Sequence, residues 1–369
     1  MTEPAAQRSA FAGGVLLAVV AALAFGVTTP FIARAQGEGS PVATACLLYL
    51  GAAAAAVVSR IGRRGAADAR LRAAHLPRLA LVALFGAVIA PVALAWGLPR
   101  TGATAGSLLL CLEAVFTALL AWAIHREPIG RRVALALALM TAAGVMLAGG
   151  SLGAEPIDQL GVAAIALATL AWASDNVLTR PLADLEPLSV VAVKGAFGGA
   201  ATGAVALAAG FTWPALPGAL LLFGCGATGY GLSLRLYLLA QRRIGTGRTG
   251  SIFALAPFFG AALAFALGDR TGGVAVAAAG ALFATGVFLH ATERHEHHHV
   301  HAPMSHEHMH RHDDGHHDHV HDPPIAGAHS HPHEHAATAH AHAHAPDLHH
   351  AHGHDRSSDT RSAGRAPRN

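Results

Sequence analysis

The chain has 369 residues, of which 53% are hydrophobic and only 13% are charged, with a formal net charge of +3. This charge does not indicate a nucleic-acid-binding surface, because the arginines lie between long apolar runs, where they orient a membrane protein. The three cysteines, Cys46, Cys111 and Cys225, lie inside apolar runs without metal-ligand spacing, which argues against a disulfide framework.

Ten apolar runs are long enough to cross a bilayer, because a hydrocarbon core of about 30 Å needs roughly 20 residues in a helix. The first run follows Arg8 and resembles a signal peptide, but it exceeds the usual apolar region of about 7–15 residues. We therefore expect an uncleaved first span. The predicted spans are 11–33, 41–59, 79–98, 103–124, 131–149, 160–179, 188–210, 218–239, 249–267 and 272–291.

The loops between the spans predict the orientation of the protein. The longest one, from Arg60 to Arg78, is rich in arginine, and cytoplasmic loops carry an excess of basic residues. Alternation then places the acidic loop with Glu155 and Asp158 outside and both termini in the cytoplasm. We expect a multi-pass protein of the inner (plasma) membrane.

The two halves of the membrane region, residues 11–149 and 160–291, resemble each other. The segment Leu112–Ala121 matches Leu255–Ala264, and each half holds five spans. An odd number of spans means that the second half enters the membrane from the opposite side. The prediction is an all-α membrane protein of ten transmembrane helices in two inverted five-helix repeats, a plan in which many secondary transporters bind substrate near the bilayer midplane.

Polar groups inside the spans are candidates for function, because a charge at the bilayer centre costs about 2.5–3.5 kcal/mol on insertion scales. Glu113 lies near the middle of the fourth span, either as proton acceptor or substrate ligand, or as a hydrogen-bonded link between helices. Lys194, the only lysine, and Arg235 either extend to the interface or contact substrate. The predicted substrate-binding set is Glu113, Trp172, Asp175, Asn176, Lys194 and Arg235.

Two further expectations concern these same spans. Asp175 and Asn176 either pair with Lys194 or Arg235, or line an inner vestibule. Three prolines, Pro30, Pro91 and Pro257, are expected to kink their helices, and broken spans often border substrate paths.

The motifs of the two halves resemble a known family. The first half reads Leu112-Glu113-Ala114-Val115-Phe116 and then Arg126-Glu127-Pro128; the second reads Leu255-Ala256-Pro257-Phe258-Phe259 and then Gly268-Asp269-Arg270. In order and spacing these segments are similar to the EamA family of the drug/metabolite transporter superfamily. The resemblance implies an inner-membrane exporter of small metabolites without an ATPase. The chain departs from the family pattern at Ala114, where proline is typical, and at Ala256, which lacks the glutamate.

The C-terminal segment 292–369 has a different composition. It holds 24 of the 27 histidines and few large apolar side chains, so we expect it to be disordered and cytoplasmic. Neutral imidazole is a common ligand of Zn, Ni, Co and Cu, and a flexible chain brings several imidazoles around one ion. The predicted ligands are His297, His299, His306, His308, His310, His312, His317, His319, His321, His329, His331, His333 and His335. The alternative is a solubilising tail whose metal binding is incidental.

These patterns favour a secondary transporter that exports a small metabolite by alternating access. The second hypothesis is a divalent-metal exporter of the same fold, whose tail gathers Ni, Co or Zn at the cytoplasmic face. A third is a metal-sensing or structural membrane protein without transport. We expect no enzyme activity, no required cofactor and no nucleic-acid partner. The expected partners are the lipid bilayer and the substrate, and a homodimer is left open.

Overall fold

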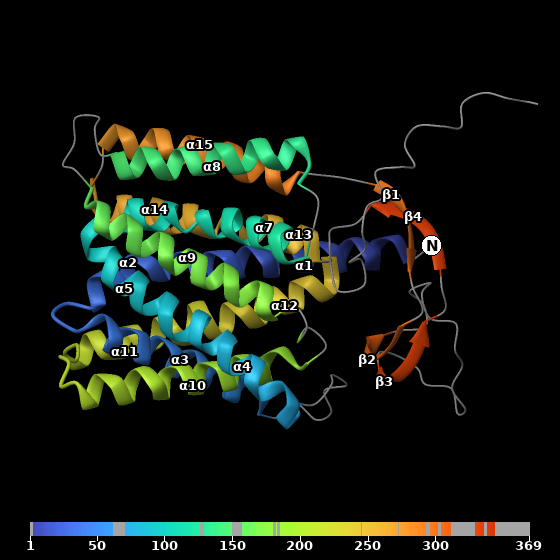
Figure 1. Cartoon of the computed structure of the whole chain (residues 1–369), viewed down its shortest axis with the longest axis horizontal. Coiled ribbons are helices and arrows are strands. Elements are labelled where there is room, and N and C mark those ends of the chain that lie inside the picture. Colours follow the sequence, from blue (N-terminus) through green and yellow to red (C-terminus); the bar gives the residue numbers. More distant parts are fainter. Residues whose placement is uncertain are drawn as a thin grey trace, which may run out of the picture.

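The helices of the protein lie side by side along one direction, as the computed structural model shows (Figure 1). The structure describes residues 3–61, 71–125, 129–149, 157–179, 182, 185–244, 246–271, 273–292, 296–301, 304–310, 329–335 and 338–343. Within these residues, ten helices are long and apolar enough to cross a membrane, which confirms the predicted spans. The third runs over residues 73–101 rather than 79–98. The elements η1 (Ala73–His75) and α4 (Leu76–Ala83) extend it at its start, and α5 (Ala90–Thr101) extends it to Thr101.

The first half contains spans one to five. Two of these spans are continuous helices and three are interrupted. In chain order the elements are α1 (Glu3–Gly26), α2 (Thr28–Ala35), α3 (Pro41–Arg60), η1 (Ala73–His75), α4 (Leu76–Ala83), η2 (Leu84–Ile89), α5 (Ala90–Thr101), α6 (Ala103–Leu109), α7 (Leu112–His125) and α8 (Arg131–Gly149).

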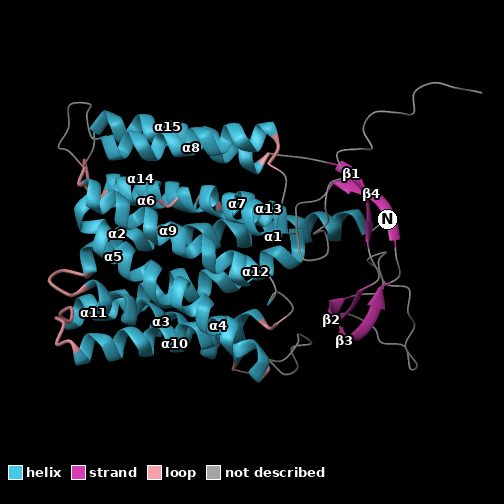
Figure 2. Cartoon of the chain, in the orientation of Figure 1, coloured by secondary structure: helices cyan, strands magenta, loops and turns pink. Residues whose placement is uncertain are grey.

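The second half contains spans six to ten and repeats much of this pattern. Its elements are α9 (Gln159–Thr179), α10 (Pro187–Ala208), α11 (Leu216–Cys225), η4 (Gly226–Leu232), α12 (Ser233–Ile244), α13 (Thr246–Phe253), α14 (Ala256–Ala266) and α15 (Gly273–Ala291). Helix and short connections account for nearly all of the described residues of both halves (Figure 2).

The irregular places of the two halves correspond. The third span of each half contains a π-helical segment, η2 in the first half and η4 in the second. The fourth span of each half is interrupted, between α6 and α7 and between α13 and α14. Pro91 and Pro257 lie just after such irregularities, and Pro30 lies in α2 just after the break at Val27. Proline lacks the N–H that an unbroken helix needs, which fits its place beside these interruptions; the kinks themselves stay a prediction.

Equivalent helices of the two halves also pack against each other. The second spans, α3 and α10, are in contact, and so are the fifth spans, α8 and α15 (Figure 1). Small residues permit these approaches: a Cβ on Gly195 of α10 would lie 2.8 Å from the carbonyl oxygen of Tyr49. The two halves therefore meet over most of their length through close backbone contacts.

One end of the bundle, which we call the Asp269 end, is held by contacts between the halves. Asp269 lies in the turn between α14 and α15, and one oxygen of its carboxylate accepts a hydrogen bond from the backbone N–H of Thr104 at 2.7 Å. Arg34 donates to the carbonyl of Leu267 at 2.7 Å, and the N–H of Ser40 donates to the carbonyl of Thr212 at 2.9 Å. At the opposite end, the Arg60 end, Arg60 pairs with Glu186 at 3.2 Å.

The described part of the C-terminal tail contains four strands: β1 (Glu296–His301), β2 (Met304–His310), β3 (His329–His335) and β4 (Thr338–Ala343). They form two separate antiparallel pairs, β1 with β4 and β2 with β3. This differs from the expected absence of regular structure. Alternating sequences suit strand pairing through the backbone, but a two-stranded sheet is only marginally stable in water, so these pairs do not constitute a packed domain.

Candidate functional site

A candidate site is built around Gly86, in the π segment of the third span. The carbonyl oxygen of Gly86 accepts hydrogen bonds from the hydroxyl of Tyr49 and from the indole N–H of Trp172, the latter at 3.1 Å. Tyr49 comes from α3 and Trp172 from α9, and both side chains are buried. The two hydrogen bonds to the carbonyl oxygen of Gly86 therefore connect spans two and three of the first half with span six of the second half.

An ion pair lies on the other side of Gly86. The ammonium of Lys194 on α10 is bonded to a carboxylate oxygen of Asp175 on α9. A Cβ on Gly86 would lie 2.6 Å from the nitrogen of Lys194, so no residue with a side chain fits here without displacing the pair. The expected pairing of Asp175 with Lys194 is therefore present, and the ammonium points to the carboxylate rather than to the membrane surface.

Glu113 lies in the first turn of α7, just after the interruption of the fourth span. One oxygen of its carboxylate accepts a hydrogen bond from the amide nitrogen of Asn176 at 2.8 Å. Glu113 is half-buried and Asn176 is exposed. The carboxylate of Glu113 is close enough to Asp175, Lys194, Tyr49 and Tyr230 for electrostatic interaction.

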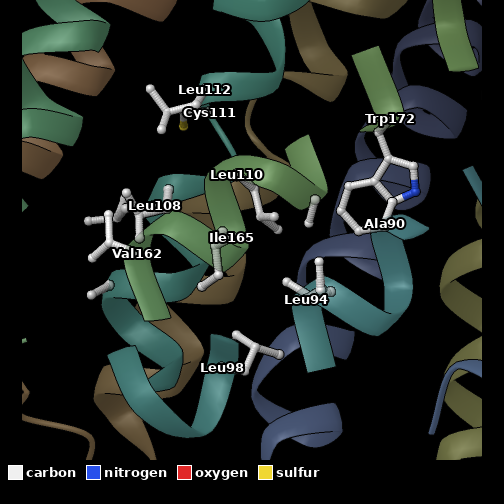
Figure 3. Close-up of a cluster of buried hydrophobic side chains, with 14 of the residues drawn as sticks. Ala90, Leu94, Leu98, Leu108, Leu110, Cys111, Leu112, Val162, Ile165 and Trp172 are labelled. Atoms are coloured by element: carbon white, nitrogen blue, oxygen red, sulfur yellow. The ribbon is translucent and has the colours of Figure 1, made fainter. Parts of the chain in front are cut away.

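Aromatic rings cover the same region. Tyr230, in the π segment η4, is the central one, with its ring centroid 5.4 Å from that of Phe25, 5.6 Å from Tyr49 and 6.3 Å from Trp172. On α9, Trp172 is four residues from Asn176, so the two share a helix face. Trp172 also belongs to the large apolar cluster between the halves, where Figure 3 shows its indole on the side of Ala90 and Leu94.

We call this group the Gly86 site and define it as Tyr49, Gly86, Glu113, Trp172, Asp175, Asn176, Lys194 and Tyr230. The structure thus brings together five of the six residues that the sequence predicts for substrate binding. Arg235 lies apart from it, toward the Arg60 end, where its guanidinium is 3.4 Å from the hydroxyl of Ser59.

Three members of the site were not predicted from the sequence: Tyr49, Gly86 and Tyr230. A tyrosine hydroxyl inside an apolar run was an available signal for the two tyrosines, since a buried hydroxyl needs a partner. Gly86 had no such signal, because the chain contains 41 glycines. Its role depends on the π segment and on the neighbouring spans.

Metal ligands are not gathered in the part of the chain that the structure describes, where no three His, Cys, Asp or Glu side chains are grouped to hold an ion. Among the predicted tail ligands, His312, His317, His319 and His321 lie outside the described residues. The other nine lie in the paired strands, of which the backbone is described. Metal binding by the tail stays a prediction.

Ten spans in two corresponding halves, with charged and aromatic side chains at their junction, are typical of a membrane transporter. Comparison with known sequences specifies the family: the sequence pattern of the EamA-like transporter family matches residues 12–149 and again residues 159–291. The chain belongs to the EamA-like transporter family. The resemblance noted in the motifs is confirmed, as is the expectation that the protein is a transporter rather than an enzyme.

Two similar proteins agree with this assignment. An uncharacterized transporter of Methanothermobacter thermautotrophicus is 30% identical over 239 residues, which are 63% of this chain and 69% of the relative. A protein known from a crystal structure superposes with a TM-score of 0.56 at 18% identity, covering 75% of this chain and 95% of the other. At that identity the second comparison supports the fold alone.

Proposed function

We propose that the protein exports a small metabolite across the inner membrane by alternating access, with the Gly86 site as its binding site. Alternating access in inverted-repeat transporters moves two halves around a site at their junction. The Gly86 site draws residues from spans two, three and four of the first half and from spans six, seven and eight of the second.

One observation carries this proposal: Glu113 and Asp175 each match an uncharged residue at the equivalent position of the other repeat. Gly229 in η4 is the counterpart of Gly86 in η2. A Cβ on Gly229 would lie 2.5 Å from a methyl carbon of Thr28, in the first span. A Cβ on Gly86 would likewise meet Asp175, in the sixth span. Thr28 thus occupies the place of Asp175, and Ala256 matches Glu113 in the repeated sequence. The fold forms without charges at these places, which favours a functional role for Glu113 and Asp175.

The distribution of arginines supports the orientation that we propose. Arg60, Arg132, Arg243 and Arg248 lie at or near helix ends on the side where α1 begins and α15 ends. The positive-inside rule supports a cytoplasmic location for this end and for both termini. Export then means that the substrate enters the Gly86 site from the Arg60 end and leaves at the Asp269 end.

A direct test compares metabolites released by cells that overproduce the protein with those released by cells producing Glu113→Gln. We expect one class of small metabolites to accumulate in the medium only with the unaltered protein. Equal amounts of both proteins in the membrane serve as the control. Identical release profiles at equal amounts would contradict the proposal.

The histidine tail keeps a second function open, the export of Ni, Co or Zn gathered by the tail at the cytoplasmic face. Its support is the 24 clustered histidines. Truncation after Arg294 removes them and leaves every span intact. If metal is the substrate, truncation lowers metal tolerance, most strongly at low metal where capture limits the flux. Unchanged tolerance together with continued metabolite release would exclude this second function.

A further inference from the structure

We infer that the Gly86 site is selective for a small organic cation, such as an amine with an apolar or aromatic body. This inference rests on the proposed transport function and specifies its substrate class. It is carried by three features: the charge balance of the site, the rings around it, and the absence, among the residues that the structure describes, of an available cation to hold an anionic group.

The charge balance is negative. With all groups ionised, Glu113 and Asp175 contribute two negative charges and Lys194 one positive charge, which leaves an excess of one negative charge. Asp175 and Lys194 neutralise each other directly. The unbalanced carboxylate is that of Glu113, whose hydrogen-bond partner Asn176 is a neutral amide. A bound cation would compensate this charge in a region where uncompensated charge is costly.

The rings favour the same class of ligand. The ring centroids of Phe25, Tyr49 and Trp172 each lie within 6.3 Å of the ring centroid of Tyr230. Aromatic faces attract ammonium groups and also bind apolar bodies. Trp172 and Asn176 share one face of α9, so the hydrogen-bond partner of Glu113 lies one turn from the indole.

Anions and zwitterions lack a matching group. A carboxylate needs a cation or several N–H donors, and the ammonium of Lys194 is already bonded to Asp175. The indole N–H of Trp172 is used by the carbonyl of Gly86, and Arg235 lies away from the site near Ser59. Within the described residues the site therefore offers an acceptor for an ammonium group but no free donor set for a carboxylate.

The test uses three probes with the same body and different charge: 2-phenylethylamine, phenylalanine and 3-phenylpropionate, which are cationic, zwitterionic and anionic at pH 7. Binding to the full chain in lipid nanodiscs is measured by calorimetry. We expect 2-phenylethylamine to bind at least tenfold more tightly than the other two. The variant Glu113→Gln should lower its affinity by about tenfold or more, because it replaces a charged acceptor of the ammonium with a neutral one.

Two further variants keep the inference testable. Asp158→Asn removes the same charge near the Asp269 end, where Asp158 lies 3.8 Å from Arg100, and it should leave the affinity for 2-phenylethylamine unchanged. Tyr230→Leu removes the central ring and keeps Glu113, so it should weaken binding several-fold without changing the order of the three probes. If Glu113→Gln does not fold, unchanged binding of 2-phenylethylamine by Tyr230→Leu would contradict the inference.

The outcomes separate the inference from the proposed function. Equal or tighter binding of phenylalanine or 3-phenylpropionate overturns the cation class and leaves small-metabolite export standing. Binding of none of the probes, or unchanged affinity in Glu113→Gln, also overturns the inference. Export itself is judged by the metabolite-release comparison, which uses no chosen ligand.

Discussion

The two π segments and their surroundings show how one scaffold supports two different environments. Around Gly86, the neighbouring spans supply Asp175, Lys194 and Glu113; around Gly229, the neighbouring span supplies Thr28. Thr28 satisfies its own hydroxyl by donating to the carbonyl of Phe25 at 2.6 Å. The neutral side shows what helix packing alone requires, namely small residues in close contact. The charged side adds an ion pair and a hydrogen-bonded carboxylate to this packing.

The largest expected effect comes from Glu113 and its counterpart. Glu113→Gln should abolish transport while the protein still inserts into the membrane, because the side chain keeps its shape and loses its charge. Ala256→Ser, at the matching place of the neutral side, should leave transport within about twofold, since a small hydroxyl can bond within its own helix. Transport of the released metabolite by membrane vesicles measures both. An equal loss of transport in the two variants would contradict the difference that we expect between the charged place at Glu113 and the neutral place at Ala256.

The Asp175–Lys194 pair should show the next largest effect, on stability. Lys194→Met leaves the buried carboxylate of Asp175 without its partner, and breaking a buried pair in this way costs about 3–5 kcal/mol. Adding Asp175→Asn should restore most of that loss, because neither charge then stays uncompensated. Thermal unfolding in detergent checks both. A double variant no more stable than Lys194→Met would show that the pair is not coupled.

The two glycines give a matched pair of intermediate size. Gly86→Ala places a methyl group against both members of the ion pair, whereas Gly229→Ala meets Thr28. Overpacking costs about 1–3 kcal/mol where neighbours cannot move, so we expect the Gly86 variant to lose more stability and more transport. Unfolding temperatures and uptake by vesicles compare the two. A larger loss in Gly229→Ala would mean that backbone fit, not the charged pair, limits the third span.

The smallest effect concerns Asp269, a carboxylate of the second half that lies at a helix end. Burial alone would raise its pKa, but hydrogen bonds from Thr104 and Thr271 outweigh burial and lower it. A lowered folded-state pKa means that the ionised group stabilises the fold above its unfolded pKa of about 3.9, and that this contribution is lost as the pH falls through the folded value.

Asp269→Asn should therefore destabilise the protein by about 1 kcal/mol or less at pH 7, because the group is half-exposed. The difference between variant and unaltered protein should shrink below about pH 4. Unfolding followed at pH 7 and at pH 3.5 checks the sign. A difference that grows on acidification would contradict the assigned hydrogen bonds.

Hydropathy was sufficient to predict the ten spans, because the need to bury apolar length is local along the chain, and the repeated motif predicted the two halves. Hydropathy also singled out Glu113, Lys194 and Asp175, since charges stand out inside apolar runs. It could not predict which of them pair, because pairing depends on the rotation of each helix. Tyr49 and Gly86 escaped for the same reason: their importance arises only where the π segment presents a carbonyl to neighbouring spans.

The tail shows a different limit of sequence reasoning. Low apolar content predicts the absence of a packed core, and the four described strands form two separate two-stranded sheets. Alternating histidines nevertheless suit a pleated strand, in which every second residue shares a face. Composition therefore predicts whether a segment can form a packed core, but it does not predict whether the backbone of that segment pairs into strands.

The matching π segments also bear on the origin of the protein. A π turn is an α-helix with one residue added, and such an added residue is usually destabilising unless it is used. The segments Leu84–Ile89 and Gly226–Leu232 have it in the same span of each half. A single insertion in an ancestral five-helix unit, copied when that unit was duplicated and fused, accounts for both. The charged residues around Gly86 come from both copies, Glu113 from the first and Asp175 and Lys194 from the second, and are then later changes around a π segment that both copies inherited.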